Sequence, residues 1–546
     1  MSTALTPFLI VAIPFGFYHL YVFFLRLLRP RPPYPPGPRG YPLIGDLFNE
    51  ASKNVEQHEW ARYLKMGKEY NSDVLHINVL GDHKLILNSA KAADELLEKR
   101  SGLYSDRPQF HMMSGLCGWH WHFATMSYSN TWRAHRKTFH QDFQAKAIST
   151  YCPFILRSTS NFLKKLAPAE YSPLHMLDIE HAELDSYVRN YAGSTILRAV
   201  YGMSTQEELD DYVGLAHLAA ESLIATMNHG SFFVDYLPWL KYIPAWFPGA
   251  SFKQKANTWA PMVSNLINEP WKRLKSSMAN GTALPCFATN NLERSNPVSN
   301  LDVDPIKNNN FDPEIEEVIK NCSAAAYFAG SDTTVSLVMS SILALSHHPE
   351  VLEKAHEELD RVIGTSRLPE LHDRDKLPYL QAFIKEVERM YPVAPLSVAH
   401  RVISDDIYDG YFISKGTTVI PNIGAILHSE ELYQDPLNFN PDRFLQNDKD
   451  SKLSPDPEIV AFGFGRRICP GRDFALDSAW TLIACLLATC DITGPSEEAQ
   501  KNSRKPDPVL DYFDGLVVHP KPYKCQIVPR SITALNLMKA GYENQM

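Results

Sequence analysis

The stretch FGFGRRICPG, residues 462–471, places one cysteine among three glycines, two arginines and a proline. A lone cysteine is commonly a small buried hydrophobic residue, and this is the simplest interpretation of Cys469. The rest of the chain has to decide whether this simple interpretation is sufficient.

The composition excludes several classes of protein. The chain has 546 residues, of which 45% are hydrophobic, and this is typical of a globular protein with a large core. A net charge of -9 without a basic tract argues against nucleic acid as a partner. The eight cysteines lack the paired spacing of a metal site, which indicates reduced thiols in a domain that faces the cytosol.

The N-terminal residues differ in kind from the rest. Residues 5–25 carry no charge and are long enough to cross a hydrocarbon core of about 30 Å. Arginines follow at 26, 29 and 31 with no Lys or Arg before the stretch, so the positive-inside rule places the following chain in the cytoplasm. The alternative is a cleaved signal peptide, but its basic start and small-residue cleavage site are missing.

We therefore divide the chain into three parts. Residues 1–28 are predicted to form one transmembrane helix, and residues 29–45, rich in proline, a stiff linker. A proline-rich ligand for a signalling domain is the alternative for the linker. Residues 46–546 are predicted to form one mainly α domain with a small β region (α+β), including strands at 73–80 and 416–422 and a surface loop at 281–311.

A long helix is predicted to begin after Asp312, which can cap it, and to end near Ser346. Its middle, AGSDTT at 329–334, inserts small and hydroxyl residues into an apolar helix. A threonine hydroxyl there can bond back to a carbonyl and open the helix locally. Simple helix packing through small residues remains an equally good explanation.

Further on, LPYLQAFIKEVERMYP predicts a helix opened by Pro378. Glu386 and Arg389 are three residues apart, share a helix face and can pair. An ordinary surface ion pair is the alternative. The string PDRF then brings Arg443 just upstream of the cysteine loop.

Together these strings resemble the cytochrome P-450 family of haem-thiolate monooxygenases. The opening string fits the family pattern Phe-x-x-Gly-x-Arg-x-Cys-x-Gly, and EVER supplies its Glu-x-x-Arg. PDRF matches Pro-Glu-Arg-Phe with Asp442 in place of Glu, AGSDTT matches the oxygen-activation motif, and WRAHR at 132–136 matches Trp-x-x-x-Arg. All five occur in the family's order. Residues 240–253 resemble fungal secondary-metabolism members of the O-methylsterigmatocystin-oxidoreductase type.

The resemblance implies a haem b cofactor, with the Cys469 thiolate as the axial ligand of its iron. Gly465 and Gly471 are expected to let the loop turn tightly and to bring backbone N–H groups to the sulfur, and Phe462 to pack beside it. The haem propionates are expected to meet Trp132, Arg136, Arg467 and His400. A buried, structural charge network is expected from Glu386, Arg389 and Arg443.

On the opposite side, the resemblance assigns Thr333 and Asp332 to delivering protons to bound oxygen. Electrons are expected from NADPH through NADPH-cytochrome P-450 reductase, with cytochrome b5 as a further donor. The reductase would meet a basic patch of Arg133, Lys137, Arg466 and Arg472, beside which Asp473 stands where many relatives have His. The implied location is the endoplasmic reticulum membrane, single-pass, with the catalytic domain in the cytoplasm.

The substrate is expected to be a hydrophobic small molecule of terpenoid, sterol, polyketide or indole type. The residues expected to face it are Met112, Met113, Leu116, Trp119, Phe123, Phe328, Val393, Ala394 and Leu396. His120 and His122 are interpreted as packing or polar lining rather than metal ligands. The aromatic stretch 232–249 is expected to dip into the membrane interface, with a buried core segment as the alternative.

Two rival functions remain. A haem-thiolate isomerase or dehydratase would work without a reductase, and often lacks the Thr and acid pair. A non-catalytic membrane carrier of haem or lipid would need no proton relay. The presence of Thr333 and Asp332 therefore favours a monooxygenase.

Overall fold

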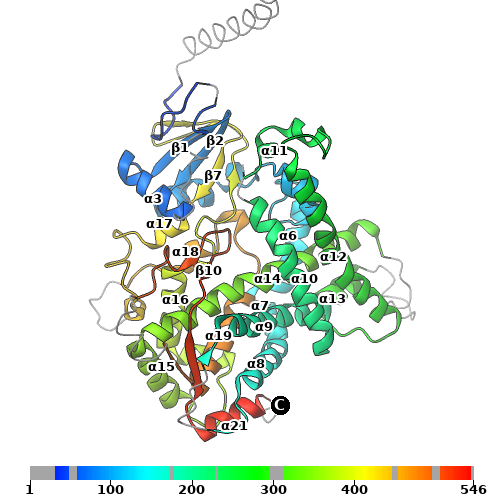
Figure 1. The fold of residues 1–546 in the computed structure, drawn as a ribbon, viewed down its shortest axis with the longest axis vertical. Helices are drawn as coiled ribbons and strands as arrows, with labels where there is room; N and C mark the ends of the chain where they lie inside the picture. The colour runs from blue at the N-terminus through cyan, green and yellow to red at the C-terminus, as the bar shows by residue number, and fades with distance from the viewer. Residues whose placement is uncertain are drawn as a thin grey trace, which may run out of the picture.

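The computed structural model describes residues 31–42, 44–47, 58–171, 178–227, 231–295, 311–445, 453–494 and 505–542. The predicted transmembrane helix of residues 1–28 lies outside this part. Within it the chain is mostly helical with a small β region, as expected (Figure 1).

The helices that frame the molecule are α3 (Glu59–Tyr70), α4 (Ala90–Ala93), α5 (Ser101–Tyr104), α6 (Asn130–Phe143), α7 (Ala145–Ile148), α8 (Cys152–Leu166), α9 (His181–Tyr201), α10 (Gln206–Met227), α11 (Phe233–Tyr236), α12 (Ser251–Ala279), α13 (Phe287–Ser295), α14 (Pro313–His347), α15 (Pro349–Val362), α16 (Pro378–Met390), α17 (Ile423–Leu427), α18 (Glu458–Ala461), α19 (Arg472–Thr489) and α21 (Ile532–Ala540). Shorter 3-10 or π turns are η1 (Asp94–Lys99), η2 (His111–Leu116), η3 (Trp119–Trp121), η4 (Ser149–Tyr151), η5 (Pro238–Tyr242), η6 (Leu371–Lys376), η7 (Pro441–Phe444) and η8 (Gly465–Arg467).

The largest sheet has the strand order β1 (Val74–Val79), β2 (Asp82–Leu87), β7 (Thr418–Pro421), β4 (His400–Arg401). Strands β2 and β7 are parallel, with Leu85 opposite Val419, and the other pairs are antiparallel. A second sheet joins β3 (Asp178–Ile179), β11 (Cys525–Pro529) and β8 (Cys490–Thr493). Two hairpin-like pairs are β5 (Asp406–Tyr408) with β6 (Tyr411–Ile413), and β9 (Tyr512–Phe513) with β10 (His519–Pro520). The predicted strands at 73–80 and 416–422 are confirmed.

The central helix α14 confirms the sequence prediction closely. Asp312 caps it, since its carboxylate accepts from the backbone N–H of Glu314 at 2.9 Å. The helix runs unbroken through the middle of the molecule (Figure 1). Among the described residues it alone has the length and composition of a membrane span, but 78% of its most apolar window is buried. It is therefore a core helix here.

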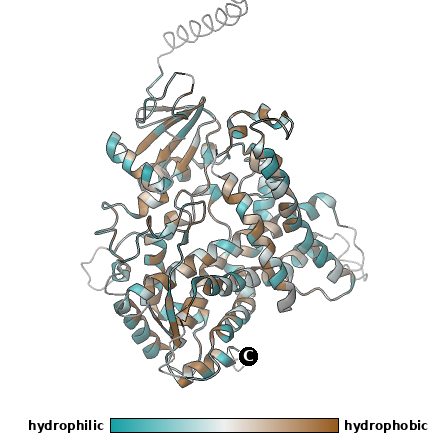
Figure 2. Ribbon diagram, viewed as in Figure 1, coloured by the Kyte–Doolittle hydropathy of each residue, from teal (hydrophilic) through white to brown (hydrophobic). Residues whose placement is uncertain are grey.

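Two hydrophobic cores meet along α14. Residues 319–328 of the helix pack into one cluster with α9, α10 and α12, and residues 335–345 pack into a second with α16 and α19. The AGSDTT segment lies between the two. Figure 2 shows hydrophobic residues concentrated on the inner helices and hydrophilic residues on the outer ones. The polar segment is thus placed where the two cores leave the helix uncovered.

The predicted surface loop at 281–311 is wrong in part. Residues 287–295 form the helix α13, whose Phe287 and Leu292 are fully buried. The segment is polar in composition, yet its few apolar residues share one face at helical spacing and pack onto α14 and α9. The helical spacing of the apolar residues, rather than the polar composition of the segment, indicates the helix.

The described residues of the proline-rich linker are hydrogen-bonded to β1 of the largest sheet and to β6 of a two-stranded pair. The backbone N–H groups of His76 and Phe412 donate to the carbonyls of Pro36 and Pro33, at 2.9 and 2.8 Å. The ring of Tyr34 stacks on the imidazoles of His76 and His83, with centroids 4.4 and 4.9 Å apart. The linker therefore approaches the domain at the end formed by β1 and β2.

Candidate active site

The cysteine loop turns through two glycines that adopt left-handed backbone conformations. Gly463 has φ 80° and Gly465 has φ 53°. A Cβ on Gly465 would lie 2.5 Å from the carbonyl oxygen of Leu97 and 2.8 Å from Cβ of Ser101. Only glycine fits this position, because both the conformation and the close approach to η1 and α5 exclude a side chain.

For Gly471 the expectation of a tight turn is wrong, whereas the expected approach of its N–H to the sulfur agrees with the structure. Its φ is -100°, and an added Cβ would meet nothing within 4 Å, so the turn does not require glycine there. What Gly471 contributes is its backbone N–H, which is directed at the Cys469 sulfur. A hydrogen bond to the sulfur favours the thiolate form.

The Cys469 side chain is exposed, unlike those of most other cysteines of the chain. It lies deep enough within the surrounding protein that burial raises the thiol pKa. The Gly471 N–H and the guanidinium groups of Arg136 and Arg472 oppose this rise. Helix α19 begins three residues later, so the positive end of its dipole also faces the sulfur. The loop thus holds an accessible sulfur among groups that stabilise its anionic form.

Helix α6 brings two of the predicted cofactor residues to this loop. Ser129 caps the helix by accepting from the N–H of Trp132 at 3.1 Å. Trp132 and Arg136 are four residues apart and share a face. The Trp132 ring lies 4.3 Å from the guanidinium carbon of Arg467, and Arg136 lies close enough to Cys469 to interact electrostatically.

Arg467 is fixed by backbone carbonyls. Its guanidinium donates to the oxygens of Ser105 at 2.8 Å, Phe123 at 3.3 Å and Met126 at 2.7 Å. Burial lowers its pKa to about 10, so it stays charged at neutral pH. Arg467 therefore ties the cysteine loop to the segment 105–126.

Sequence reasoning missed a second buried arginine, Arg107. It donates to the carbonyl oxygens of Ala124 at 2.8 Å, Val398 at 2.6 Å and Ala399 at 2.8 Å. It lies beside His400, whose Nδ1 donates to the Tyr104 carbonyl at 2.7 Å. Burial, with Arg107 and Arg467 nearby, holds the pKa of His400 well below its usual range. Its neutral ring has used its N–H, so it can offer a carboxylate no hydrogen bond unless it gains a proton.

These residues fit a haem. Arg136 is half-buried, and no described residue accepts a hydrogen bond from it or forms an ion pair with it. A buried cation without a partner is costly, and a propionate carboxylate is the group it would pair with. The accessible Cys469 sulfur is the ligand type that haem-thiolate iron requires.

The predicted charge network comes together as a buried cluster. Both Glu386 oxygens accept from Arg389, at 2.7 and 2.8 Å, and Arg443 lies 3.1 Å from the same carboxylate. Arg389 also donates to the carbonyls of Leu427 and Pro436. The side chains of Glu386 and Arg389 have no exposed surface. The surface ion-pair alternative is therefore wrong, and the network ties α16 to η7.

The AGSDTT segment interrupts the burial of α14. Ala329 is exposed and Thr333 half-buried, whereas residues 321–328 and 334–346 of the helix are buried. Thr333 Oγ1 donates to the Ala329 carbonyl at 2.9 Å, as expected, and the helix remains continuous. Packing explains a further part of the motif, since a Cβ on Gly330 would come within 3.0 Å of Ile196 on α9.

Asp332 is held by two residues that sequence reasoning missed. Its Oδ1 lies 3.0 Å from Arg189 Nη1 on α9 and 3.1 Å from His519 Nε2 on β10. Burial raises the pKa of this carboxyl, but His519 and Arg189 outweigh burial and bring it down to about 2. Asp332 is therefore an anion at neutral pH, locked between two other elements.

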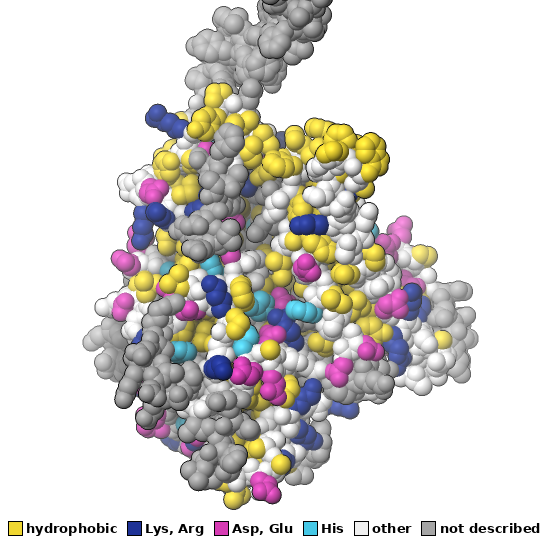
Figure 3. Space-filling view, in the orientation of Figure 1, with side chains coloured by type: hydrophobic (Ala, Val, Ile, Leu, Met, Phe, Trp, Pro, Cys, Tyr) yellow, Lys and Arg dark blue, Asp and Glu magenta, His cyan; other side chains and the backbone are white. Residues whose placement is uncertain are grey.

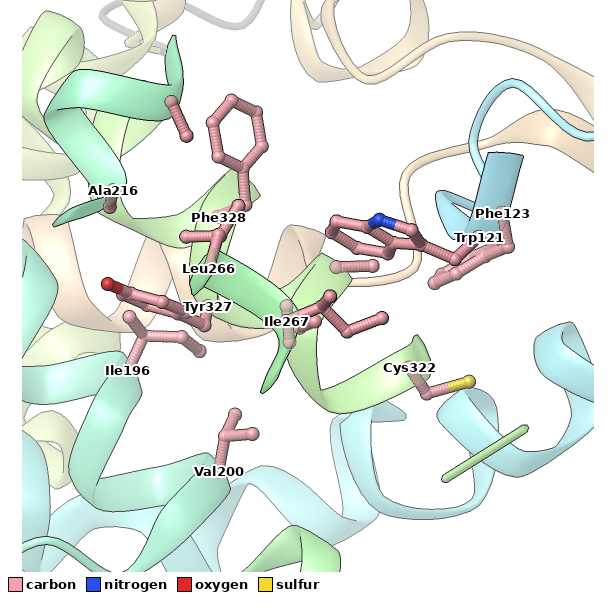
Figure 4. Packing of buried hydrophobic residues seen from close by; sticks show 14 of the residues in the cluster. Trp121, Phe123, Ile196, Val200, Ala216, Leu266, Ile267, Cys322, Tyr327 and Phe328 are labelled. Carbon is pink, nitrogen blue, oxygen red and sulfur yellow. The ribbon is translucent and has the colours of Figure 1, made fainter. Parts of the chain in front are cut away.

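The predicted substrate-facing residues are placed in different clusters. Met112, Met113, Trp119, Phe123 and Phe328 belong to one buried cluster, and Leu116 packs against it. Figure 4 shows part of this cluster, with Trp121 and Phe123 opposite residues of α9, α10, α12 and α14. Val393 and Leu396 pack against two other clusters, and Ala394 is half-buried.

The two neighbouring histidines differ. His120 is exposed, and His122 is buried among Trp119, Trp121 and Phe328. Among the described residues no group of three or more His, Cys, Asp or Glu is arranged to hold a metal ion.

Comparison with known proteins gives the same family throughout. The family profile described as Cytochrome P450 matches residues 35–527. Cytochrome P450 monooxygenase 208 of Postia placenta is 39% identical over 526 residues, which cover 96% of each chain. Cytochrome P450 monooxygenase 98 of the same fungus is 36% identical over 513 residues, 93% of each chain. Tryptamine 4-monooxygenase of Psilocybe cyanescens is 34% identical over 503 residues, 91% of this chain and 93% of the relative.

Proposed function

Since the chain belongs to the cytochrome P450 family, we propose that it is a membrane-anchored monooxygenase that inserts one oxygen atom from O2 into a hydrophobic small molecule of fungal secondary metabolism. The monooxygenase class and the haem cofactor with cysteine-ligated iron follow from the family itself. The substrate class, the anchor and the redox partner are the proposal.

The observation that carries the proposal is the cysteine loop. The exposed Cys469, the Gly471 N–H directed at its sulfur, and Arg136, which has no hydrogen-bond or ion-pair partner among the described residues, support Cys469 as the iron ligand and Arg136 as a propionate partner. Bound haem supplies the activation of O2, and the thiolate ligand favours cleavage of the O–O bond. The protein's part is to hold the sulfur anionic and to pair the propionates.

Proton delivery is the second task of the chain. The Thr333 hydroxyl lies on the uncovered part of α14 and can hold a proton at Oγ1 for the reacting oxygen. Asp332, the preceding residue, is anionic and lies 3.1 Å from His519, whose two ring nitrogens are buried. These residues favour a monooxygenase over an isomerase, a dehydratase or a non-catalytic carrier, none of which requires protons from solvent at this point.

An exposed aromatic surface supports membrane attachment. On and after α11, Phe233, Trp239, Tyr242 and Trp246 are 59%, 59%, 78% and 81% exposed. A core segment would not expose such rings, so the buried alternative does not fit. Figure 3 shows hydrophobic side chains gathered at the end of the molecule that carries α11 and the β1–β2 strands. The linker docks on those strands, so anchor and aromatic surface could enter one membrane.

A basic surface near the cysteine loop supports a reductase partner. Arg133, Lys137 and Arg466 are exposed, and the two arginines converge on the Tyr128 hydroxyl. Arg472 contributes less, because it pairs with Asp473 at 3.3 Å. Cationic groups beside the haem ligand suit an acidic reductase surface. NADPH-cytochrome P-450 reductase, with cytochrome b5 as a further donor, is the partner we propose.

Product analysis tests the proposal. The full chain is co-expressed with a fungal reductase, supplied with terpenoid, sterol, polyketide and indole candidates, and products are identified by mass spectrometry. We expect a product heavier by one oxygen atom, with label from 18O2 and consumption of NADPH. A product of unchanged mass, formed without NADPH, would instead establish an isomerase.

A further inference from the structure

Two adjacent side chains near Phe328 of α14 have buried nitrogens with no hydrogen-bond partner among the described residues. Both ring nitrogens of His122 and the indole nitrogen of Trp121 are buried, and no described residue is hydrogen-bonded to them. The two residues are only 6% and 4% exposed. Buried polar atoms are almost always paired, because an unpaired one costs free energy in the folded state.

The neighbouring tryptophan, in contrast, has a partner. Trp119 Nε1 donates to the hydroxyl of Ser222 on α10 at 3.0 Å. Trp121 and His122 follow directly on the same segment, yet they point to no such acceptor.

The histidine is held in a fixed position. The backbone N–H of His122 donates to the Trp119 carbonyl at 3.0 Å. The His122 backbone carbonyl accepts from the backbone N–H and the hydroxyl of Thr125, at 3.1 and 3.0 Å. Its ring lies edge-on to Phe328, with centroids 6.0 Å apart. Phe328 directly precedes Ala329, an exposed residue of α14, and Thr333 lies five residues after Phe328, about 7.5 Å along the helix axis. His122 therefore packs against the turn of α14 that leads into the AGSDTT segment.

The chemistry of these atoms defines what they can bind. Burial lowers the pKa of His122 to about 4, so the ring is neutral and offers one donor and one acceptor. The Trp121 indole adds a second donor. A group rich in acceptor lone pairs satisfies this set, whereas an ammonium, which only donates, leaves both N–H groups unpaired.

We propose that His122 and Trp121 bind a neutral oxygen function of the substrate, a hydroxyl or a carbonyl, and thereby orient an otherwise hydrophobic molecule toward Thr333. This rests on the proposed monooxygenase function and narrows its substrate class to molecules that already carry oxygen. His122 and Trp121 are specificity-determining residues, and they take no part in the oxygen chemistry.

The test uses four probes with one carbon skeleton: bornane, borneol, camphor and bornylamine. Their binding to the full haem-loaded chain is measured by calorimetry, which requires no turnover. Borneol and camphor are expected to bind at least about ten-fold more tightly than bornane and bornylamine. His122→Phe should abolish this preference, and His122→Gln, which keeps a donor and an acceptor, should restore part of it.

The matched control is His120→Phe. His120 is exposed and lies two residues before His122, so this variant should keep the preference for borneol and camphor. Ligand-free His122→Phe should unfold at a temperature no lower than the wild type, because it removes unpaired polar atoms. A clear loss of stability would mean that His122 is already paired, for example with internal water, and would overturn the proposal. So would tightest binding of bornylamine, or equal or absent binding of all four probes.

Failure of this proposal and failure of the proposed function are distinguishable. The haem-thiolate assignment is read from the carbon monoxide spectrum of the wild type, which does not depend on His122. A normal spectrum with no preference among the probes removes only the oxygen-binding role. An absent thiolate band removes the enzyme class.

Discussion

Replacing Asp332 with asparagine removes a charge and leaves the shape of the side chain. In the folded protein, Arg189 and His519 bring the Asp332 pKa from the ordinary 3.8 down to about 2. At 1.36 kcal/mol for each pKa unit, the ion pairs stabilise the fold by about 2 kcal/mol, net of burial. Asp332→Asn should lose this amount at neutral pH.

Thermal unfolding followed by calorimetry is the assay. An unfolding entropy of about 2.1 cal/mol/K per residue amounts to roughly 1 kcal/mol/K for this chain, so we expect a Tm lower by about 2 °C. A group with a depressed pKa stabilises the fold above its unfolded pKa, and this is lost as pH falls through the folded pKa. The difference between wild type and variant should therefore be at least as large at pH 5 as at pH 7, and should shrink only below about pH 4.

A double-mutant cycle supplies the control. In an Arg189→Gln background Asp332 keeps only His519, so the cost of Asp332→Asn should shrink. The Asp332→Asn variant should also form less product for each NADPH consumed, because the proton relay behind Thr333 loses the Asp332 carboxylate. An unchanged Tm for Asp332→Asn, or an equal cost in both backgrounds, would refute the reasoning.

Four further outcomes are expected. Cys469→Ser should lose the red-shifted carbon monoxide band of the reduced protein, and a retained band would exclude it as the iron ligand. Thr333→Ala should keep that band and the haem content but yield hydrogen peroxide in place of product; wild-type coupling would show that protons arrive by another route. Gly465→Ala should fail to fold around haem, whereas Gly471→Ala, with open space at its Cβ, should keep the wild-type Tm; a stable Gly465→Ala would contradict the close approach to η1. Asn280, exposed in an Asn-Gly-Thr sequon, should carry no glycan in the full chain expressed in yeast, and a glycan there would reverse the proposed orientation.

Some features of the fold follow from local chemistry and could be predicted from sequence. The start of α14 depends on Asp312 and Pro313, which lie next to the helix they open. Glu386 and Arg389 share a face because three residues span nearly one helical turn. The apolar residues of α13 also recur at helical spacing, but the polar composition of the segment led to the prediction of a loop.

The sequence by itself determined the family, the cysteine loop and the order of its motifs, because these depend on residue types within a few positions of one another. Only the tertiary structure decided which groups surround them. Arg189 and His519 lock Asp332, and nothing in the local sequence of either residue marks it as a partner. The unpaired nitrogens of His122 are likewise a property of packing, because a missing partner can be recognised only when every neighbouring element is in place.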